Sequence, residues 1–304
     1  MLPSLPGNGI LFLKSNFQWW WLKPPLIHAC KYGEIMKIAL VLGGGGARGF
    51  AHVGVLKSLA KHDIEPVAIA GCSMGGLVGA LFAAGNDHLQ ILDIIKTIKP
   101  WKLLDVGRMG SLIGGKGMAH EMEKFLPGNF EELNIPLAVT AVDLQEGKLV
   151  VFNEGPLHTA LRATSSIPGI ITPEKNGDRL LIDGGLLNNL PVDVIHSLSN
   201  APVVAVDVAP SASRKIPLEE SLINRTKSVI KGKNRPMVFE LFMKAFAIPA
   251  AMLTETRLAL NPPDLLIRPE LDPDLKMEDM NRYEEAMEAG YAATEKALQT
   301  FNKF

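Results

Sequence analysis

Short apolar runs alternate with longer segments of helical periodicity along most of the chain, from residue 37 onward. An apolar run of about four to eight residues that ends at a turn signal predicts a buried strand, and apolar residues recurring every three to four positions predict a helix. The predicted strands are 37–42, 67–70, 136–142, 148–152, 179–182, 202–208 and 264–268. The predicted helices are 49–62, 74–84, 87–97, 117–126, 155–163, 191–198, 236–258 and 279–302. This alternation predicts an α/β fold with a largely parallel sheet.

The first 35 residues show neither the strand pattern nor the helical periodicity. They include several prolines and three consecutive tryptophans, Trp19, Trp20 and Trp21. A regular strand pattern begins only after Met36. We interpret residues 1–35 as an N-terminal extension that is not part of the fold, and Met36 is then an alternative start. A signal peptide is disfavoured because Lys14 and Lys23 interrupt the apolar stretch.

The remaining chain divides by pattern into an alternating part and a helical part. We expect residues 36–210 to form the core of the fold, and residues 211–304 to complete the same domain as a C-terminal helical region. The segment 236–258 is unusually rich in Met and Phe, and we expect Pro249 to break or kink it. It is either a core helix or an apolar cap that receives acyl chains or touches a bilayer, with the polar segment 210–235 as its hinge.

Composition and charge narrow the possible functions. The net charge is −1 and no basic stripe occurs, so we expect no nucleic-acid partner. The two cysteines, Cys30 and Cys72, and the seven histidines lack metal-ligand spacing, so we expect no metal and no cofactor. No apolar run reaches the roughly 20 residues that span a bilayer. We therefore expect a cytoplasmic protein, at most peripheral to the inner membrane face; the sequence predicts no oligomeric state.

The sharpest chemical signal is the motif Gly71-Cys72-Ser73-Met74-Gly75. It follows a predicted strand and precedes a predicted helix, which is the context that a nucleophile elbow requires. Gly71 and Gly75 leave room for the strained turn, and the Ser73 hydroxyl then points out over the sheet. We therefore predict that Ser73 is a nucleophile.

A second motif joins the first predicted strand to its helix: Gly43, Gly44, Gly45, Gly46, Ala47, Arg48 and Gly49. Its unshielded backbone amides suit an anion. A dinucleotide-binding loop needs an acid at the end of the second strand, and that strand ends at Ser73 instead. We favour an oxyanion hole beside Ser73, made by residues 44–49. Arg48 either adds positive charge to this pocket or fixes the loop through a salt bridge.

A serine nucleophile needs a base, and the histidines offer no good candidate. The last of them, His196, lies on a predicted surface helix, and we expect His52 to be packed or capping. The segment Leu181-Ile182-Asp183-Gly184-Gly185 ends a short apolar strand in an aspartate followed by two glycines. By itself this is also an ordinary Asp-Gly turn. Other polar residues have common structural roles: Cys72 in packing, Ser165 and Ser166 in a loop, and Asp143 in a turn or in ordering the site.

Taken together, the glycine-rich loop with Arg48, the elbow at Ser73 and the distant Asp183-Gly184-Gly185 resemble the patatin-like phospholipases. Further landmarks of the resemblance are Ala141-Val142-Asp143-Leu144 and the run from Leu161 to Gly169. The resemblance covers roughly residues 37–208. Within the family, the chain is similar to the short bacterial branch that is related to the catalytic domain of neuropathy target esterase. The third motif has Asp-Gly-Gly where many members have Asp-Gly-Ala.

The resemblance implies a three-layer fold, with a mostly parallel central sheet flanked by helices, and a Ser-Asp dyad. Ser73 would attack an ester carbonyl and Asp183 would accept its proton, giving a hydrolase of fatty-acyl esters of phospholipids, lysophospholipids or related lipids. The alternative is a regulatory or lipid-binding protein with little turnover. The sequence does not separate phospholipase from thioesterase or general esterase activity.

Overall fold

The computed structural model describes residues 35–97, 117, 121–209, 237–276 and 279–301. The predictions for residues 1–34 and 210–235 therefore fall on segments outside the described residues, and the helix predicted at 117–126 is described only in part. None of the described helices is long and apolar enough to cross a membrane.

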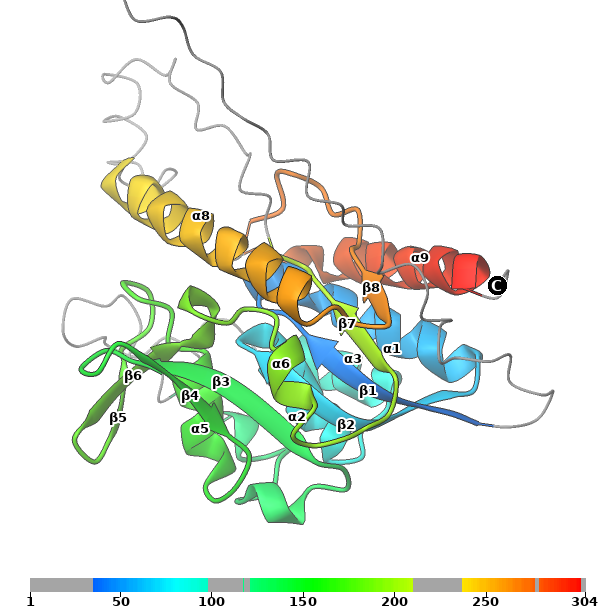
Figure 1. Ribbon diagram of the computed structural model, residues 1–304, viewed down its shortest axis with the longest axis horizontal. Helices are drawn as coiled ribbons and strands as arrows, with labels where there is room; N and C mark the ends of the chain where they lie inside the picture. The colour runs from blue at the N-terminus through cyan, green and yellow to red at the C-terminus, as the bar shows by residue number, and fades with distance from the viewer. Residues whose placement is uncertain (1–34, 98–116, 118–120, 210–236, 277–278, 302–304) are drawn as a thin grey trace, which may run out of the picture.

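One twisted sheet runs through the described chain (Figure 1). Its strands are β1 (Met36–Leu42), β2 (Ile64–Cys72), β3 (Leu137–Asp143), β4 (Lys148–Phe152), β5 (Glu174–Asn176), β6 (Arg179–Asp183), β7 (Val203–Val206) and β8 (Leu265–Ile267). The order is β5-β6-β3-β2-β1-β7-β8, and β4 also pairs with β3. The five strands from β3 to β8 in this order run parallel, whereas β4 and β6 lie antiparallel to β3 and β5 lies antiparallel to β6.

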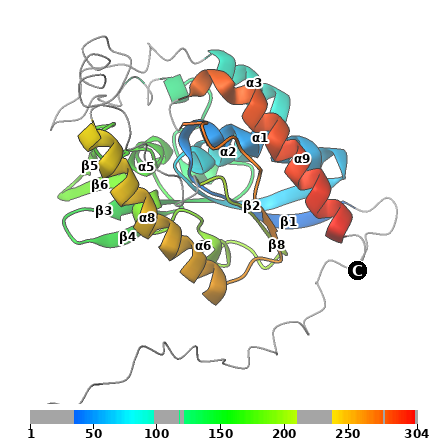
Figure 2. The same cartoon turned by 90° about the horizontal axis from the view of Figure 1, so that it is seen from above.

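Helices cover both faces of the sheet (Figures 1 and 2). The first face carries α1 (Ala51–Lys61), α2 (Met74–Ala83), α3 (His88–Thr97), α5 (Leu157–Thr164) and α9 (Tyr283–Phe301). The second face carries α6 (Val192–Ile195) and the end of α8 (Met237–Leu260). Short 3-10 turns complete the described elements: η2 (Gly46–Phe50), η4 (Phe130–Glu132), η5 (Gly184–Leu186) and η6 (Met280–Arg282).

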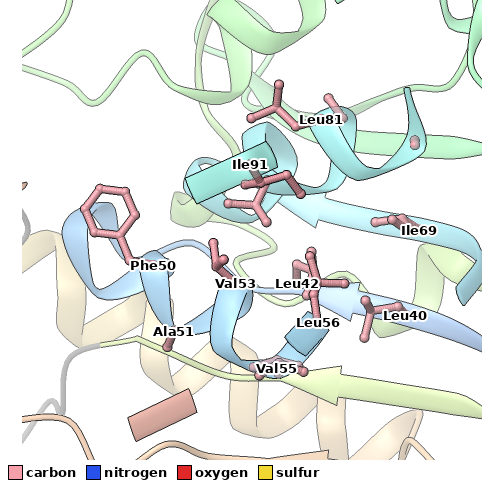
Figure 3. Close-up of a cluster of buried hydrophobic side chains, with 14 of the residues drawn as sticks. Leu40, Leu42, Phe50, Ala51, Val53, Val55, Leu56, Ile69, Leu81 and Ile91 are labelled. Carbon is pink, nitrogen blue, oxygen red and sulfur yellow. The ribbon is translucent and has the colours of Figure 1, made fainter. Parts of the chain in front are cut away.

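The side chains of β1 alternate between two buried clusters, as the pleat of a central strand requires. Leu40 and Leu42 point into the larger cluster, which Figure 3 shows with residues of α1, α2 and α3 around them. Ala39 and Val41 point into the second cluster, under α6. Because alanines line much of that second face, α6 can approach the sheet closely. β1 is thus fixed from both sides, and so is the loop that follows it.

The C-terminal helix α9 packs directly on α1. A Cβ atom at Gly54 would lie 1.9 Å from the Met287 carbonyl oxygen, and one at Gly290 would lie 2.0 Å from the Ala51 carbonyl oxygen. Only glycine allows such a close helix crossing. The contact ties α9 to the helix that follows the glycine-rich loop.

The α/β architecture with a central sheet between helices confirms the predicted fold class, and the strand positions agree closely with the apolar runs. Three features differ. β5 was not predicted, because Glu174–Asn176 is short and polar. The helix predicted at 191–198 is only Val192–Ile195. The expected break at Pro249 is absent, and α8 continues to Leu260. Pro249 and Ala245 are both exposed, so water can satisfy the carbonyl that the proline leaves unpaired.

Candidate active site

Ser73 stands at the turn between β2 and α2 in a conformation that few non-glycine residues adopt. Its backbone has φ 51° and ψ −125°. A Cβ atom at Gly71 would lie 2.7 Å from the Gly75 carbonyl oxygen, and one at Gly75 would lie 2.1 Å from the Leu42 carbonyl oxygen. Both glycines are therefore required by the close packing of this turn against the end of β1. This is the geometry of a nucleophile elbow.

The sheet register carries Ser73 to the level of Asp183. Cys72 pairs with Thr140 of β3, and the next residue of β3, Ala141, pairs with Asp183 at the end of β6. Ser73 and Asp183 are both buried, and the Ser73 side chain lies close enough to the Asp183 carboxyl to lower its pKa as a hydrogen-bond donor. The two residues selected from the sequence as nucleophile and base thus lie together, because β2 and β6 pair with successive parts of the same edge of β3, opposite β4.

Two further donors orient the Asp183 carboxylate. Its Oδ1 accepts a hydrogen bond of 2.8 Å from the Gly185 amide and a weaker one of 3.5 Å from the Cys72 thiol. Burial, followed by the charge of Asp183, holds the pKa of Cys72 well above its usual value, so the thiol keeps its proton and acts as a donor. Cys72 therefore does more than fill space. Its position next to the nucleophile in the elbow motif was the only sequence signal for this role.

Asp183 is poised as a base at neutral pH. Burial raises the pKa of its carboxyl from 3.8 to about 6, against the hydrogen bonds from Ser73, Gly185 and Cys72, which lower it. A carboxylate with a pKa near 6 is ionised at pH 7 and accepts a proton more readily than an ordinary aspartate.

The glycine-rich loop lies beside the elbow, at the end of the neighbouring parallel strand. A Cβ atom at Gly44 would lie 3.0 Å from Ser73 Cβ and 2.6 Å from Asn189 Oδ1. The Gly44 amide already donates to the Asn189 carbonyl at 3.2 Å, and Asn189 Nδ2 donates to the Gly44 carbonyl at 3.1 Å. Asn189, which the sequence did not single out, thus fixes Gly44 from two directions.

Only some amides of this loop are available to an anion. The Gly43 amide donates to Val206 and the Arg48 amide donates to Gly45. No acceptor within the described residues takes the amides of Gly45, Gly46 and Ala47, which precede or begin the η2 turn. Gly49 lies further along η2, where a Cβ atom would lie 2.4 Å from Met74 Cγ.

The Arg48 side chain anchors the loop. It is buried, and its guanidinium donates to the carbonyls of Val208, Asp272 and Leu275 at 3.0–3.3 Å. Of the two roles considered for Arg48, these contacts with backbone carbonyls match fixing the loop.

The remaining polar residues have structural contacts. His52 is fully buried, its Nε2 lies 2.8 Å from the Gly43 carbonyl oxygen, and burial lowers its pKa to about 4, so it stays neutral and donates there. His196 is exposed at the end of α6. Asp143 accepts from the Gln145 amide in a turn. Ser166 Oγ lies within hydrogen-bond distance of the Arg162 carbonyl in α5 and of the Thr172 carbonyl. The described residues contain no cluster of His, Cys, Asp or Glu suited to a metal ion.

A buried serine on a nucleophile elbow, beside a desolvated aspartate and flanked by backbone amides that have no acceptor among the described residues, is suited to acyl transfer through a serine ester. Residues 40–196 match the family model for patatin-like phospholipases. The chain belongs to this family, and the proteins to which it is similar include NTE family proteins.

Two relatives illustrate this membership. Over 180 residues the chain is 37% identical to an uncharacterized NTE family protein of Mycobacterium tuberculosis, covering 57% of this chain and 49% of that protein. Over 183 residues it is 36% identical to patatin-like phospholipase domain-containing protein 7 of Rattus norvegicus, covering 56% of this chain and 13% of that protein. The chain thus spans about half the length of the mycobacterial relative and far less of the rat one.

The fold has a counterpart among solved structures. The crystal structure of VipD from Legionella pneumophila superposes with a TM-score of 0.53 at 14% identity, covering 88% of this chain and 67% of that one. At this identity the likeness concerns the fold alone.

The desolvation of Asp183 predicts a pH-dependent stability. Its folded-state pKa of about 6 lies above the ordinary value of 3.8, so the native state binds the proton more readily than the unfolded chain. The carboxyl therefore stabilises the fold at low pH, and this contribution is lost as the pH rises through about 6. We expect the unfolding free energy of Asp183→Asn, relative to that of the wild type, to rise by roughly 1 kcal/mol per pH unit between about pH 4 and 6. Above about pH 7 this difference should stay constant.

Urea unfolding of both proteins across this range measures the difference. The asparagine variant keeps an acceptor oxygen for the Gly185 amide, so the comparison isolates the charge. A difference in unfolding free energy that does not change with pH contradicts the desolvation of Asp183.

Proposed function

We propose that this chain is a serine acyl hydrolase that cleaves fatty-acyl esters of phospholipids, lysophospholipids or related lipids through Ser73 and Asp183. The observation that carries the proposal is the placement of the buried Ser73 beside the buried Asp183 carboxyl, whose pKa the serine lowers as a hydrogen-bond donor. Family membership supports a lipid hydrolase in general terms. The assignment of the two residues and of the substrate class rests on the site.

In the proposed reaction, Ser73 Oγ attacks the ester carbonyl carbon while its proton passes to Asp183. The C–O bond of the leaving alcohol then breaks, and the proton held by Asp183 passes to that oxygen. An acyl group is left on Ser73 as an ester. Burial has raised the pKa of Asp183 to about 6. The free-energy change of each of these proton transfers is therefore closer to zero than with an ordinary aspartate.

The amides of Gly45 and Gly46 are the proposed oxyanion donors. They lie in the loop that contacts the elbow, and they have no acceptor of their own among the described residues. The Gly44 amide, by contrast, donates to Asn189, so Gly44 contributes by holding the loop close to Ser73. Preorganised donors of this kind stabilise a developing oxyanion because they need no reorientation during the reaction.

Water completes the cycle by the reverse sequence. Asp183 accepts a proton from a water molecule, the resulting hydroxide attacks the acyl carbonyl, and Ser73 Oγ leaves with the proton returned by Asp183. The products are the fatty acid and the regenerated serine. Every step uses side chains and amides of this chain, with no redox change.

A lipid substrate needs apolar surface near the site, and α8 is the proposed contact. Its C-terminal part is anchored beside the turn after Asp183: Arg257 donates to the Leu187 carbonyl at 3.2 Å and pairs with Asp193 at 2.6 Å. Along the helix, large apolar side chains are exposed to solvent: Leu241, Ile248, Met252, Leu253 and Leu260. This exposure argues against a core-helix interpretation for that face and supports the proposed cap or bilayer contact.

Substitution of the two proposed catalytic residues tests the reaction. We expect Ser73→Ala to lower kcat/KM for a p-nitrophenyl ester and for a lysophospholipid by at least about 10³-fold, because no other described group replaces the nucleophile. Asp183→Asn should be nearly as damaging. His196→Ala is the matched control, because His196 is exposed and far along the chain from the elbow. If ester hydrolysis persists in Ser73→Ala, or fails equally in His196→Ala, the dyad is wrong.

Substitution on α8 tests the lipid contact. Of the two phenylalanines that the sequence suggested for this purpose, the Phe242 side chain lies outside the described residues and Phe246 is half-buried. Met252 is 67% exposed and is a cleaner position. We expect Met252→Asp to lower hydrolysis of long-chain lipid in vesicles about tenfold or more, with little change for a short p-nitrophenyl ester.

Leu89→Asp on α3 provides the control, because Leu89 is a comparably exposed apolar residue, at 59%, on another helix. It should leave both activities near those of wild type. The lipid contact is contradicted if Met252→Asp lowers the two activities equally together with the melting temperature, or if Leu89→Asp has the same selective effect.

A further inference from the structure

The segment 164–166, at the end of α5, holds the backbone of both proposed catalytic residues. The Ser73 amide donates to the Thr164 hydroxyl oxygen at 2.8 Å. The Asp183 amide donates to the Ser166 carbonyl at 3.0 Å. Ser73 follows β2 and Asp183 ends β6, and these two strands pair with successive parts of one edge of β3, so this segment contacts both residues from a third element, α5.

The Ser73 backbone amide needs a hydrogen-bond acceptor from the protein. The residue has φ 51°, in the left-handed region, and a backbone held there persists only when its surroundings determine it from several sides. Ser73 is also buried, so solvent is a poor substitute for an acceptor. The Thr164 hydroxyl is the acceptor that fixes the peptide plane before the nucleophile. A change in that plane rotates the direction in which Ser73 Oγ points.

Thr164 is itself placed firmly. Its side chain is fully buried. Two residues later, Ser166 Oγ lies 2.8 Å from the Arg162 carbonyl oxygen and 3.2 Å from the Thr172 carbonyl oxygen, which closes the loop on itself. Arg162 also pairs with Glu174 on β5 at 2.9 Å. These contacts restrain the segment 164–166, which in turn holds the elbow in position.

The Thr164 hydroxyl has a second contact in the same network. Together with Thr140, it lowers the pKa of the Cys72 thiol as a hydrogen-bond donor, and the Cys72 thiol in turn donates to Asp183. A single buried hydroxyl thus contacts the backbone of the nucleophile and, through one thiol, the side chain of the base.

We propose that Thr164 is a positioning residue for the hydrolytic reaction. Its hydroxyl sets the orientation of Ser73, and the segment 164–166 sets the separation between Ser73 Oγ and the Asp183 carboxylate. The hydrogen bond of the Thr164 hydroxyl is with the backbone amide of Ser73, so in this proposal it acts through Ser73. The inference rests on the proposed function, because a fixed separation matters only if the proton passes between these two side chains.

The test compares Thr164→Val with Thr164→Ser. Valine keeps the shape of threonine and removes the hydroxyl, whereas serine keeps the hydroxyl and removes the methyl group. We expect Thr164→Val to lower kcat for a p-nitrophenyl ester by about 10²-fold with KM within about threefold of wild type, because misplacement of a nucleophile affects the reacting geometry more than binding. Thr164→Ser should restore kcat to within about fivefold of wild type.

Thr294→Val is the matched control. Thr294 is also fully buried, and its hydroxyl donates to a backbone carbonyl, that of Gly290, within α9. Its loss should lower the melting temperature without changing kcat. If Thr164→Val does not fold, Thr164→Ala removes the same hydroxyl with more space around it and replaces it in the comparison.

Wild-type kcat in the variant without the hydroxyl overturns the role of Thr164, and so does an equal loss of kcat in Thr164→Ser or in Thr294→Val. These outcomes are distinct from a failure of the proposed function. If the proposed function is wrong, the wild type does not hydrolyse esters, or hydrolysis survives Ser73→Ala.

Discussion

The backbone of Ser73 is held at φ 51° and ψ −125°, and much of the site follows from that constraint. A turn this tight needs glycine at Gly71 and Gly75, because α2 begins against the end of β1. The same closeness places the glycine-rich loop against the serine. The strained amide then requires an acceptor, which Thr164 supplies from α5. Strand register, helix start and loop composition are therefore linked through one residue.

The electrostatics of the site depend on how the sheet changes direction. β6 runs antiparallel to β3. Its register places Asp183, the last residue of β6, level with the end of β2. There the carboxylate is buried among Cys72, Gly185 and Ser73, so that its pKa rises to about 6. A histidine is not needed to obtain a base of suitable strength, because burial supplies the shift that an aspartate otherwise lacks.

Features set by local patterns were predictable from the sequence. The apolar runs located the strands beside the site, and the glycines located the tight turns at Ser73 and Asp183. Features set by long-range contacts were not. Thr164 and Asn189 resemble ordinary polar residues until the fold brings them to Ser73 and Gly44. The continuity of α8 through Pro249 depends on solvent exposure, which a helix-breaking rule does not include.

The central claim is that Ser73 is the nucleophile and Asp183 activates it. The most direct measurement is covalent labelling with a fluorophosphonate, followed by mass spectrometry of the modified peptide. The account predicts one adduct, on Ser73, whose rate of formation falls by about 10²-fold or more in Asp183→Asn while the protein remains folded. An adduct on another residue, or a rate unaffected by Asp183→Asn, would contradict it.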